Sequence, residues 1–193
     1  MKTSMDKEAL RKNGLCRREG ISESEADRKS ALVCQRFLGL KEFRLASEVA
    51  FYMAKGREVQ TLEMIKVALT LKKKVLLPAV INSEEMRMGR IYDVDRDVAV
   101  GPWGILEPKE GLMGLSDSLQ HGIVVVPGIV FDRNGGRIGF GRGYYDRFLK
   151  KNPRKVTSVG LCYSFQVENV LLPLSSNDLR VNIIVTEDSV IRC

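Results

Sequence analysis

The residues best suited to chemistry lie in the stretch RIGFGRGYYD, which begins at Arg137 and ends at Asp146. Three glycines alternate there with larger side chains: Gly139, Gly141 and Gly143. Glycine allows the backbone to adopt positive φ and to approach a ligand closely through its N–H groups. Arg137 and Arg142 flank the glycines and can form charge-assisted, bidentate bonds to phosphate oxygens. Asp146 supplies a hard oxygen ligand suited to Mg²⁺. The stretch therefore predicts a site for a nucleoside triphosphate with its metal ion.

Two familiar phosphate-binding motifs do not fit this stretch. A P-loop ends in Gly-Lys followed by Ser or Thr, and a dinucleotide fingerprint needs a third glycine where Tyr144 stands. Neither a Walker-type nucleotide site nor an NAD site follows. Tyr144, Tyr145 and Asp146 open a predicted helix, whose N-terminus adds a partial positive charge beside the glycines. The residues alone leave one alternative open, a glycine-rich turn with solvated arginines.

The loop must be positioned by the strand that precedes it. Ile123 to Val126 form a β-branched run closed by Pro127, which is typical of a strand buried on both faces of a parallel sheet. Parallel sheets bind ligands just beyond the carboxyl ends of their strands. Further strands are expected at 48–53, 75–78, 86–92, 157–163 and 181–186, and helices at 6–18, 23–37 and 62–71. Strands alternating with helices predict an α/β fold of three layers: a mostly parallel sheet of the open, doubly wound type with helices on both faces. We expect residues 1–193 to form a single domain.

The run from Pro127 to Leu149, PGIVFDRNGGRIGFGRGYYDRFL, resembles the signature of the 5-formyltetrahydrofolate cyclo-ligase family, also called methenyltetrahydrofolate synthetases. Members of that family carry Pro-Gly, Phe-Asp and Arg-x-Gly-x-Gly-x-Gly-Tyr-Tyr-Asp in this order, and every one of these positions is filled here. The likeness extends from Lys7 to Asp178. It implies an enzyme that converts 5-formyltetrahydrofolate and ATP, with Mg²⁺, into 5,10-methenyltetrahydrofolate, ADP and phosphate.

The resemblance also implies which residues bind ATP. Lys7 and Arg11 match a Lys-x-x-Leu-Arg segment that contacts the phosphates, although charge pattern alone would favour a solvated basic helix face. The expected ATP-binding set is Lys7, Arg11, Arg137, Gly139, Gly141, Arg142, Gly143, Tyr144 and Tyr145. Of these, Arg137, Arg142 and Tyr144 are expected to act in catalysis.

Two carboxylates are expected to hold Mg²⁺. Asp146 belongs to the signature, and Asp178 matches an aspartate near the end of the family's sequences. The residue before it is Asn177, where many members have histidine. Without the resemblance, Asp178 could equally be a surface-loop residue. A pair of carboxylates suits a magnesium ion that keeps most of its waters.

The folate is expected to bind opposite the phosphates. Glu58 matches the glutamate of a family Glu-x-x-Thr step that faces the folate, and Met86 matches one methionine of a Met-x-Met pair whose other member is Met88. Met53, Met86, Trp103 and Tyr144 are expected to wall the heterocycle. Trp103 lies in the loop GPWGILEP, where its side chain either caps the core or lines a pocket. Physical grounds alone leave both placements open.

Composition limits the partners. The 193 residues are 44% hydrophobic, and 31 basic against 24 acidic residues give a net charge of +7, which favours anionic ligands. We expect a small-molecule substrate and no nucleic acid, because the basic residues are scattered and no nucleic-acid motif is present. The four cysteines lack metal-like spacing, and no apolar run approaches membrane-spanning length. A cytoplasmic monomer with no membrane contact is therefore expected.

Two rival functions remain open. A non-catalytic sugar-phosphate or CoA-derivative binding module would keep the glycine loop, because fold does not fix function. Such a module would not need Lys7, Glu58, Trp103 and Asp178 together. A nucleic-acid binder would show affinity that falls steeply with salt.

Overall fold

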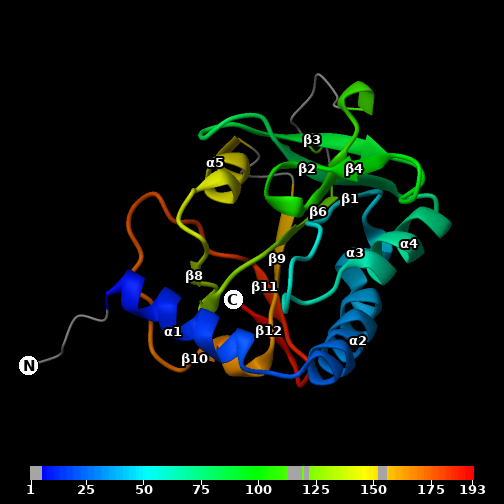
Figure 1. The fold of residues 1–193 in the computed structure, drawn as a ribbon. Coiled ribbons are helices and arrows are strands. Elements are labelled where there is room, and N and C mark those ends of the chain that lie inside the picture. The colour runs from blue at the N-terminus through cyan, green and yellow to red at the C-terminus, as the bar shows by residue number, and fades with distance from the viewer. Residues whose placement is uncertain (1–5, 113–118, 120–121, 152–155) are drawn as a thin grey trace, which may run out of the picture.

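The structure is a computed structural model that describes residues 6–112, 119, 122–151 and 156–193. Its centre is a seven-stranded sheet with the order β12-β11-β9-β6-β1-β2-β3 (Figure 1). The strands are β1 (Glu48–Ala50), β2 (Lys74–Val80), β3 (Met86–Ile91), β6 (Gly122–Val126), β9 (Val156–Leu161), β11 (Ile183–Val185) and β12 (Val190–Arg192). Neighbours from β2 through β11 pair in parallel, and the two edge strands, β3 and β12, pair antiparallel.

The strand order places a topological switch inside the sheet. The parallel strands follow the order β2-β1-β6-β9-β11, so the chain builds outward from β1 first on one side and then on the other. Chain segments leaving β1 and β6 therefore diverge and leave a crevice beyond the carboxyl ends of these two strands. Open sheets of this kind bind their ligands in that crevice.

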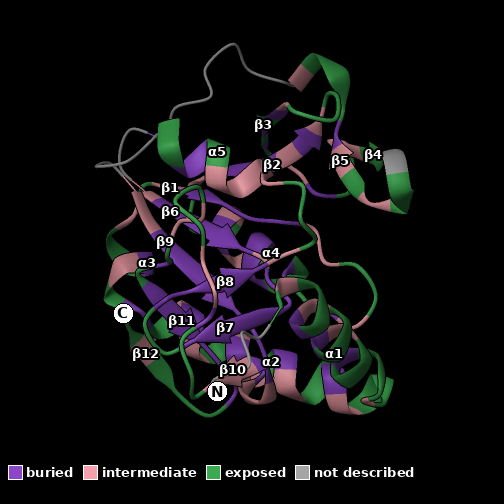
Figure 2. Ribbon diagram, turned by 90° about the vertical axis from the view of Figure 1, so that its left-hand side faces the viewer, coloured by how far each residue is buried: buried purple, intermediate pink, exposed green. Residues whose placement is uncertain are grey.

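Helices cover both faces of the sheet, and the alternation of side chains along the strands explains why. Val49, Ile123 and Val125 face a core shared with α2 (Glu23–Gly39), α3 (Lys41–Leu45) and α4 (Leu62–Thr70). The residues between them, such as Ala50 and Val124, face a second core shared with α5 (Tyr144–Lys151). The central strands are accordingly buried throughout (Figure 2). The predicted α/β fold with a mostly parallel sheet is confirmed.

Helix α1 (Lys7–Glu19) packs on a separate small sheet. That sheet has the order β10-β7-β8 and contains β7 (Val130–Asp132), β8 (Arg137–Ile138) and β10 (Val167–Glu168). Leu10 of α1 packs against Val130 and Ile138. The contact needs a glycine, because a Cβ at Gly14 would lie 2.7 Å from Cγ2 of Val130. The side chain of Asp6 caps the start of the helix by accepting a hydrogen bond from the Glu8 N–H. This packing places α1 beside the glycine loop.

The structure contains elements that the sequence patterns did not predict. The stretch after β6 was expected to be a loop, but it contains the β7–β8 hairpin. The loop around Trp103 is the tip of a second hairpin, formed by β4 (Val98–Val100) and β5 (Leu106–Pro108) with the 3-10 turn η1 (Pro102–Gly104) between them. Two more 3-10 turns are η2 (Glu110–Leu112) and η3 (Ser164–Gln166). The expected strand 48–53 ends at Ala50, because the chain turns into the crevice there.

Within the described ranges, the structure has no helix with the length and apolar character needed to cross a bilayer.

Candidate active site

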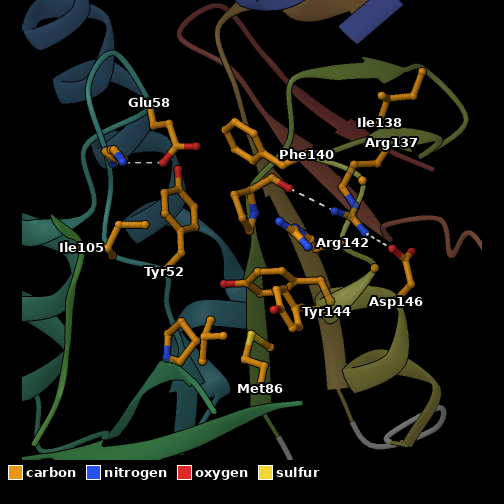
Figure 3. A pocket seen from close by; sticks show the side chains of 18 of the residues that line it. Tyr52, Glu58, Met86, Ile105, Arg137, Ile138, Phe140, Arg142, Tyr144 and Asp146 are labelled. Carbon is orange, nitrogen blue, oxygen red and sulfur yellow. Dashed lines mark hydrogen bonds and ion pairs between the residues drawn. The ribbon is translucent and has the colours of Figure 1, made fainter. Parts of the chain in front are cut away.

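A pocket of about 700 Å³ lies at the carboxyl ends of β1 and β6, at the topological switch. The segment after β1 contributes Tyr52, Met53, Lys55 and Glu58, and Pro127 follows β6. The glycine loop closes another side, and α1 contributes Lys7 and Arg11. Figure 3 shows Arg137, Arg142 and Asp146 on one side of this pocket and Tyr52, Glu58 and Ile105 on the other. The pocket therefore has two chemically different ends.

The first end is cationic, and most of its charges are held in place by hydrogen bonds. Arg137 is buried, and it donates from Nη2 to Oδ2 of Asp146 at 2.9 Å. Arg11 donates from Nε to the carbonyl oxygen of Gly139 at 2.8 Å. Lys7 forms an ion pair with Asp178. The solvated basic helix face and the turn with solvated arginines, both open from the sequence, are therefore wrong for Lys7, Arg11 and Arg137.

Arg142 differs from these three cations. It is exposed at the pocket wall, and no residue in the described part of the chain forms a hydrogen bond or ion pair with its guanidinium. A guanidinium that lacks such partners keeps its donors available for an anionic ligand. Arg142 is therefore the cation of this end best prepared to bind phosphate oxygens.

The glycine loop adopts part of the predicted backbone geometry. Gly141 has φ of +92° and Gly143 has φ of +69°, a region that glycine enters without steric cost. Gly139 has no positive φ, and its contribution is the carbonyl oxygen that accepts from Arg11. The turn before the loop is fixed by Asp132, whose Oδ1 accepts from the N–H groups of Asn134 and Gly136 at 2.9 Å each. The Phe-Asp part of the signature is thus structural.

The two carboxylates predicted to hold Mg²⁺ line the same end of the pocket. Asp146 accepts from Arg137 through Oδ2 and from the Leu179 N–H through Oδ1 at 3.0 Å. Burial by itself would raise the pKa of Asp178, but hydrogen bonds from Lys7 and Ser175 outweigh it and lower that pKa. Asp178 is therefore ionised at neutral pH and is not the free surface-loop residue that was the alternative.

The donor set fits a metal that shares its coordination with a bound ligand. No group of three or more His, Cys, Asp or Glu side chains is placed to hold a metal in the residues that the structure describes. Magnesium commonly binds through one or two carboxylates together with substrate phosphates. Asp146 and Asp178 at the cationic end of the pocket suit that arrangement.

The second end of the pocket is apolar around one buried carboxylate. Glu58 is 8% exposed, and its Oε2 accepts from the Lys55 N–H at 3.0 Å. Burial raises the pKa of Glu58, and the guanidinium of Arg18 is the strongest opposing influence. Met53 and Met86 also line the pocket. The pair Glu58 and Thr61 also stabilises the local fold, because Thr61 Oγ1 donates to the Tyr52 carbonyl at 2.7 Å.

Trp103 lines the mouth of the pocket and does not cap the core. It is 55% exposed and has φ of +63°, which is rare for a bulky residue. Lys55 ties it across the pocket by donating from Nζ to the Trp103 carbonyl at 2.7 Å. An adjoining space of about 310 Å³ shares Trp103, Arg142 and Tyr144 with the main pocket. The pocket-wall option for Trp103 is the one that the structure bears out.

Sequence reasoning missed several residues of the pocket: Tyr52, Lys55, Ile105, Glu107 and Phe140. Tyr52 and Lys55 directly follow a buried strand at the switch point, and that position was a usable signal. Ile105 and Glu107 reach the pocket only through the β4–β5 hairpin, which the sequence did not predict. In contrast, Met88 is buried in the second core and lies outside the set that lines the pocket in the described chain.

Comparison with known proteins agrees with the geometry. The family model described as "5-formyltetrahydrofolate cyclo-ligase family" matches residues 3–187. The chain belongs to this cyclo-ligase family. The predicted family membership is therefore confirmed.

Individual members of the cyclo-ligase family match over most of the chain. The probable 5-formyltetrahydrofolate cyclo-ligase of Schizosaccharomyces pombe is 30% identical, with 89% of this chain and 90% of the relative covered. The 5-formyltetrahydrofolate cyclo-ligase of Mus musculus is 27% identical, with 95% and 94% covered. The structure of the 5,10-methenyltetrahydrofolate synthetase of Aquifex aeolicus superimposes with a TM-score of 0.83 at 37% identity, covering 96% of this chain and 92% of that one. The match therefore spans both ends of the pocket.

Proposed function

We propose that this cyclo-ligase family member converts 5-formyltetrahydrofolate and ATP, with Mg²⁺, into 5,10-methenyltetrahydrofolate, ADP and phosphate. One observation carries the proposal: a single pocket joins a cationic end, suited to a triphosphate, to an apolar end with one buried carboxylate, suited to a flat heterocycle with N–H donors. Two substrates bound at these ends would meet inside one pocket. The printed names of the relatives support the same reaction.

The formyl group must be activated, because its oxygen is a weak nucleophile and a poor leaving group. The formyl oxygen attacks the γ-phosphorus, a new P–O bond forms, and the bond to ADP breaks. Nitrogen N10 of the folate then attacks the formyl carbon, loses its proton, and the C–O bond to phosphate breaks. Such a reaction requires little covalent chemistry from the protein, so positioning and charge neutralisation provide the catalysis.

The cations of the pocket provide that neutralisation. Lys7, Arg11, Arg137 and Arg142 bind the triphosphate, with the backbone of Gly139, Gly141 and Gly143 and with Tyr144 and Tyr145 around it. Arg137 and Arg142 stabilise the charge that develops on the transferring phosphoryl group. Tyr144 lines both the main pocket and the adjoining space, as Arg142 does, and its hydroxyl donates to the Asn82 carbonyl at 2.8 Å. Its ring contacts both reactants.

Asp146 and Asp178 would hold the magnesium ion together with the phosphates, and the ion would neutralise phosphate charge during transfer. The two residues keep their own partners ordered as well. Asp146 fixes the guanidinium of Arg137, and Asp178 fixes Lys7.

Glu58 binds the donor edge of the heterocycle at the other end. Met53, Met86, Trp103 and Tyr144 form the apolar walls. A buried carboxylate beside apolar walls gives orientation through hydrogen bonds and affinity through burial.

The test is absorbance at the methenyl-folate band after the protein is mixed with 5-formyltetrahydrofolate and Mg-ATP. We expect a rise that requires ATP and that stops when a chelator removes Mg²⁺. Well-folded protein that binds ATP but gives no rise would contradict the proposal. That result would favour the non-catalytic sugar-phosphate or CoA-derivative module. Inactive protein that instead bound nucleic acid, with an affinity that fell steeply with salt, would favour a nucleic-acid binder.

That the protein is cytoplasmic and that it is a monomer stay predictions. The described cysteines are all free: Cys16, Cys34, Cys162 and Cys193. Free thiols accord with a reducing compartment.

A further inference from the structure

Arg18 is a buried cation of α1 that lies behind the pocket. It is 4% exposed, and its Nη1 is 3.4 Å from Oε1 of Glu58. Within the described chain it is outside the set of residues that line the pocket, so it reaches a ligand only through Glu58. Its Nε has no hydrogen-bond partner among the described residues, but it forms a longer ion pair, at 3.7 Å, with Oε1 of the exposed Glu19. A guanidinium is retained in such a place, despite the cost of burial, where it balances a buried carboxylate.

Glu58 is held from two sides, one for each oxygen. The Lys55 N–H donates to Oε2 at 3.0 Å, and Arg18 pairs with Oε1. The titratable and charged groups around the carboxyl come from several elements: Arg18 and Glu19 of α1, Tyr52 and Lys55 of the segment after β1, and Tyr145 of α5. Burial raises the pKa of Glu58 and Glu19 adds to this rise, whereas Arg18 opposes it. Arg18 is thus the one cationic side chain in this group that directly faces the carboxylate.

The charge on Glu58 decides what it can recognise. An ionised carboxylate only accepts hydrogen bonds, whereas a protonated carboxyl must donate one. The pterin ring of a reduced folate presents an amino group and ring N–H groups along one edge, and these need an acceptor. Loss of the charge would leave donors of the bound ring without a partner.

We propose that Arg18 is a positioning residue that keeps the Glu58 carboxylate ionised and oriented toward the N–H donors of the folate ring. The role rests on the proposed function, because it assumes that folate binds at this end.

The placement of Arg18 also connects the two ends of the pocket. Lys7, Arg11 and Arg18 follow the spacing i, i+4 and i+11, which places them on one face of α1. Lys7 and Arg11 reach the cationic end, while Arg18 reaches Glu58. The guanidinium carbon of Arg18 lies 5.7 Å from the ring centre of Phe140 in the glycine loop. One helix therefore supports both substrates.

The first experiment compares Arg18→Met with Arg17→Met. Arg17 is the next residue of the same helix, and its exposed guanidinium pairs with Glu168 at 2.9 Å away from the pocket. Both variants lose one positive charge from α1. The Kd of 5-formyltetrahydrofolate, measured by calorimetry at neutral pH, should rise about 10- to 100-fold in Arg18→Met and stay within about twofold in Arg17→Met. The Kd of ATP should stay within about threefold in both, because Lys7 and Arg11 are retained. Equal folate affinity in Arg18→Met and wild type would overturn the proposal.

The pH profile separates this role from simple support of the fold. Arg18 opposes the rise that burial causes in the pKa of Glu58, so its removal raises the folded-state pKa further and the carboxyl loses its charge at a higher pH than in wild type. Folate affinity of Arg18→Met should therefore recover as pH rises from about 6 to about 9, while wild type stays nearly flat. A loss that is the same at every pH would indicate a packing defect and overturn the proposal.

Two further variants control for misfolding of Arg18→Met. Arg18→Lys keeps the charge and should recover most of the folate affinity. Arg18→Met combined with Glu58→Gln replaces the buried ion pair by neutral groups, which are often tolerated. The double variant should bind folate no more weakly than Glu58→Gln alone, and its affinity should lose the pH dependence. The double variant could instead bind folate more weakly than Glu58→Gln by the same factor that separates Arg18→Met from wild type. That result would show that Arg18 acts independently of Glu58.

The outcome for wild type separates the two hypotheses. Wild-type protein that binds no folate and forms no methenyl product overturns the proposed function and the role of Arg18 with it. Active wild type with an unaffected Arg18→Met overturns the role of Arg18 alone.

Discussion

Replacing Tyr145 by phenylalanine should stabilise the protein and slow its turnover. The Tyr145 hydroxyl is buried and has no hydrogen-bond partner among the residues that the structure describes. The ring itself packs against both main cores, so phenylalanine keeps these apolar contacts. The substitution therefore removes one unsatisfied polar atom and little else.

The size of the effect follows from the cost of burying a polar group without a partner. That cost is about 1–3 kcal/mol, and it disappears in Tyr145→Phe. For a chain of this length, each kcal/mol shifts the melting temperature by about 2–4 °C. A thermal melt followed by circular dichroism should thus show a rise of a few degrees over wild type.

Tyr163→Phe is the matched control. Its hydroxyl is buried too, but it lies 3.1 Å from Ser30 Oγ and donates to the carbonyls of Ala26 and Glu58 at 3.3 Å. Removal of a satisfied hydroxyl should lower the free energy of unfolding by about 1 kcal/mol. The two tyrosines should therefore respond with opposite signs. A melting temperature of Tyr145→Phe at or below that of Tyr163→Phe would refute the reasoning.

Turnover of Tyr145→Phe should fall although stability rises. Tyr145 lines the pocket, and burial raises the pKa of its phenol; Glu58 adds to the rise and Arg137 opposes it. A phenol with a raised pKa stays protonated and serves as a donor, not as a base. Loss of one such donor to a developing charge costs about tenfold or more in kcat. Unchanged kcat would show that the Tyr145 hydroxyl donates to no charge that develops during turnover.

Three other substitutions test the cationic end of the pocket. Arg142→Ala should reduce kcat about a hundredfold with a normal thermal melt, because its guanidinium has no partner among the described residues; Arg133→Ala, on the nearby hairpin, is the control. Gly141→Ala should raise the KM of ATP, since φ of +92° costs an alanine about 1–2 kcal/mol; normal KM would contradict the strained loop. Asp178→Asn should lower stability by less than about 1 kcal/mol at neutral pH. The pKa of Asp178 is lower in the folded protein than its ordinary value of 3.8. The ionised side chain therefore stabilises the fold above pH 3.8, and this stabilisation is lost as pH falls through the folded-state pKa. The free energies of unfolding of Asp178→Asn and wild type, measured with urea, should therefore become equal in acid. A difference that persists there would contradict the ion pair of Asp178 with Lys7 as its cause.

The parallel core of the fold could be predicted because its signals are local. β6 is a β-branched run closed by Pro127, and α2 starts at Ser22, whose side chain accepts from the Glu25 N–H at 3.1 Å. Signals of this kind need only a few neighbouring residues. The small sheet was missed because its strands are only two or three residues long, too short to show an alternating pattern. Its third strand, β10, also pairs with β7 from more than thirty residues later, and no local pattern reports such a pairing. That residues 1–193 form one domain stays a prediction.

The glycine loop was predictable for a similar reason, whereas Arg18 was not. Three alternating glycines and two arginines within ten residues of sequence predict a loop suited to phosphate. Arg18 shows in the sequence only as one more basic residue of a basic helix, beside the exposed Arg17. Its burial depends on Glu58, forty residues away, and on Phe140 in the glycine loop. The pairing of a buried cation with a buried carboxylate depends on tertiary structure. Charge pattern alone favours a solvated helix face. The same limit applies to Lys7, because its partner Asp178 lies near the other end of the chain. The cationic end is therefore assembled from segments that only the fold brings together, and the buried carboxylate of the apolar end depends on the same helix.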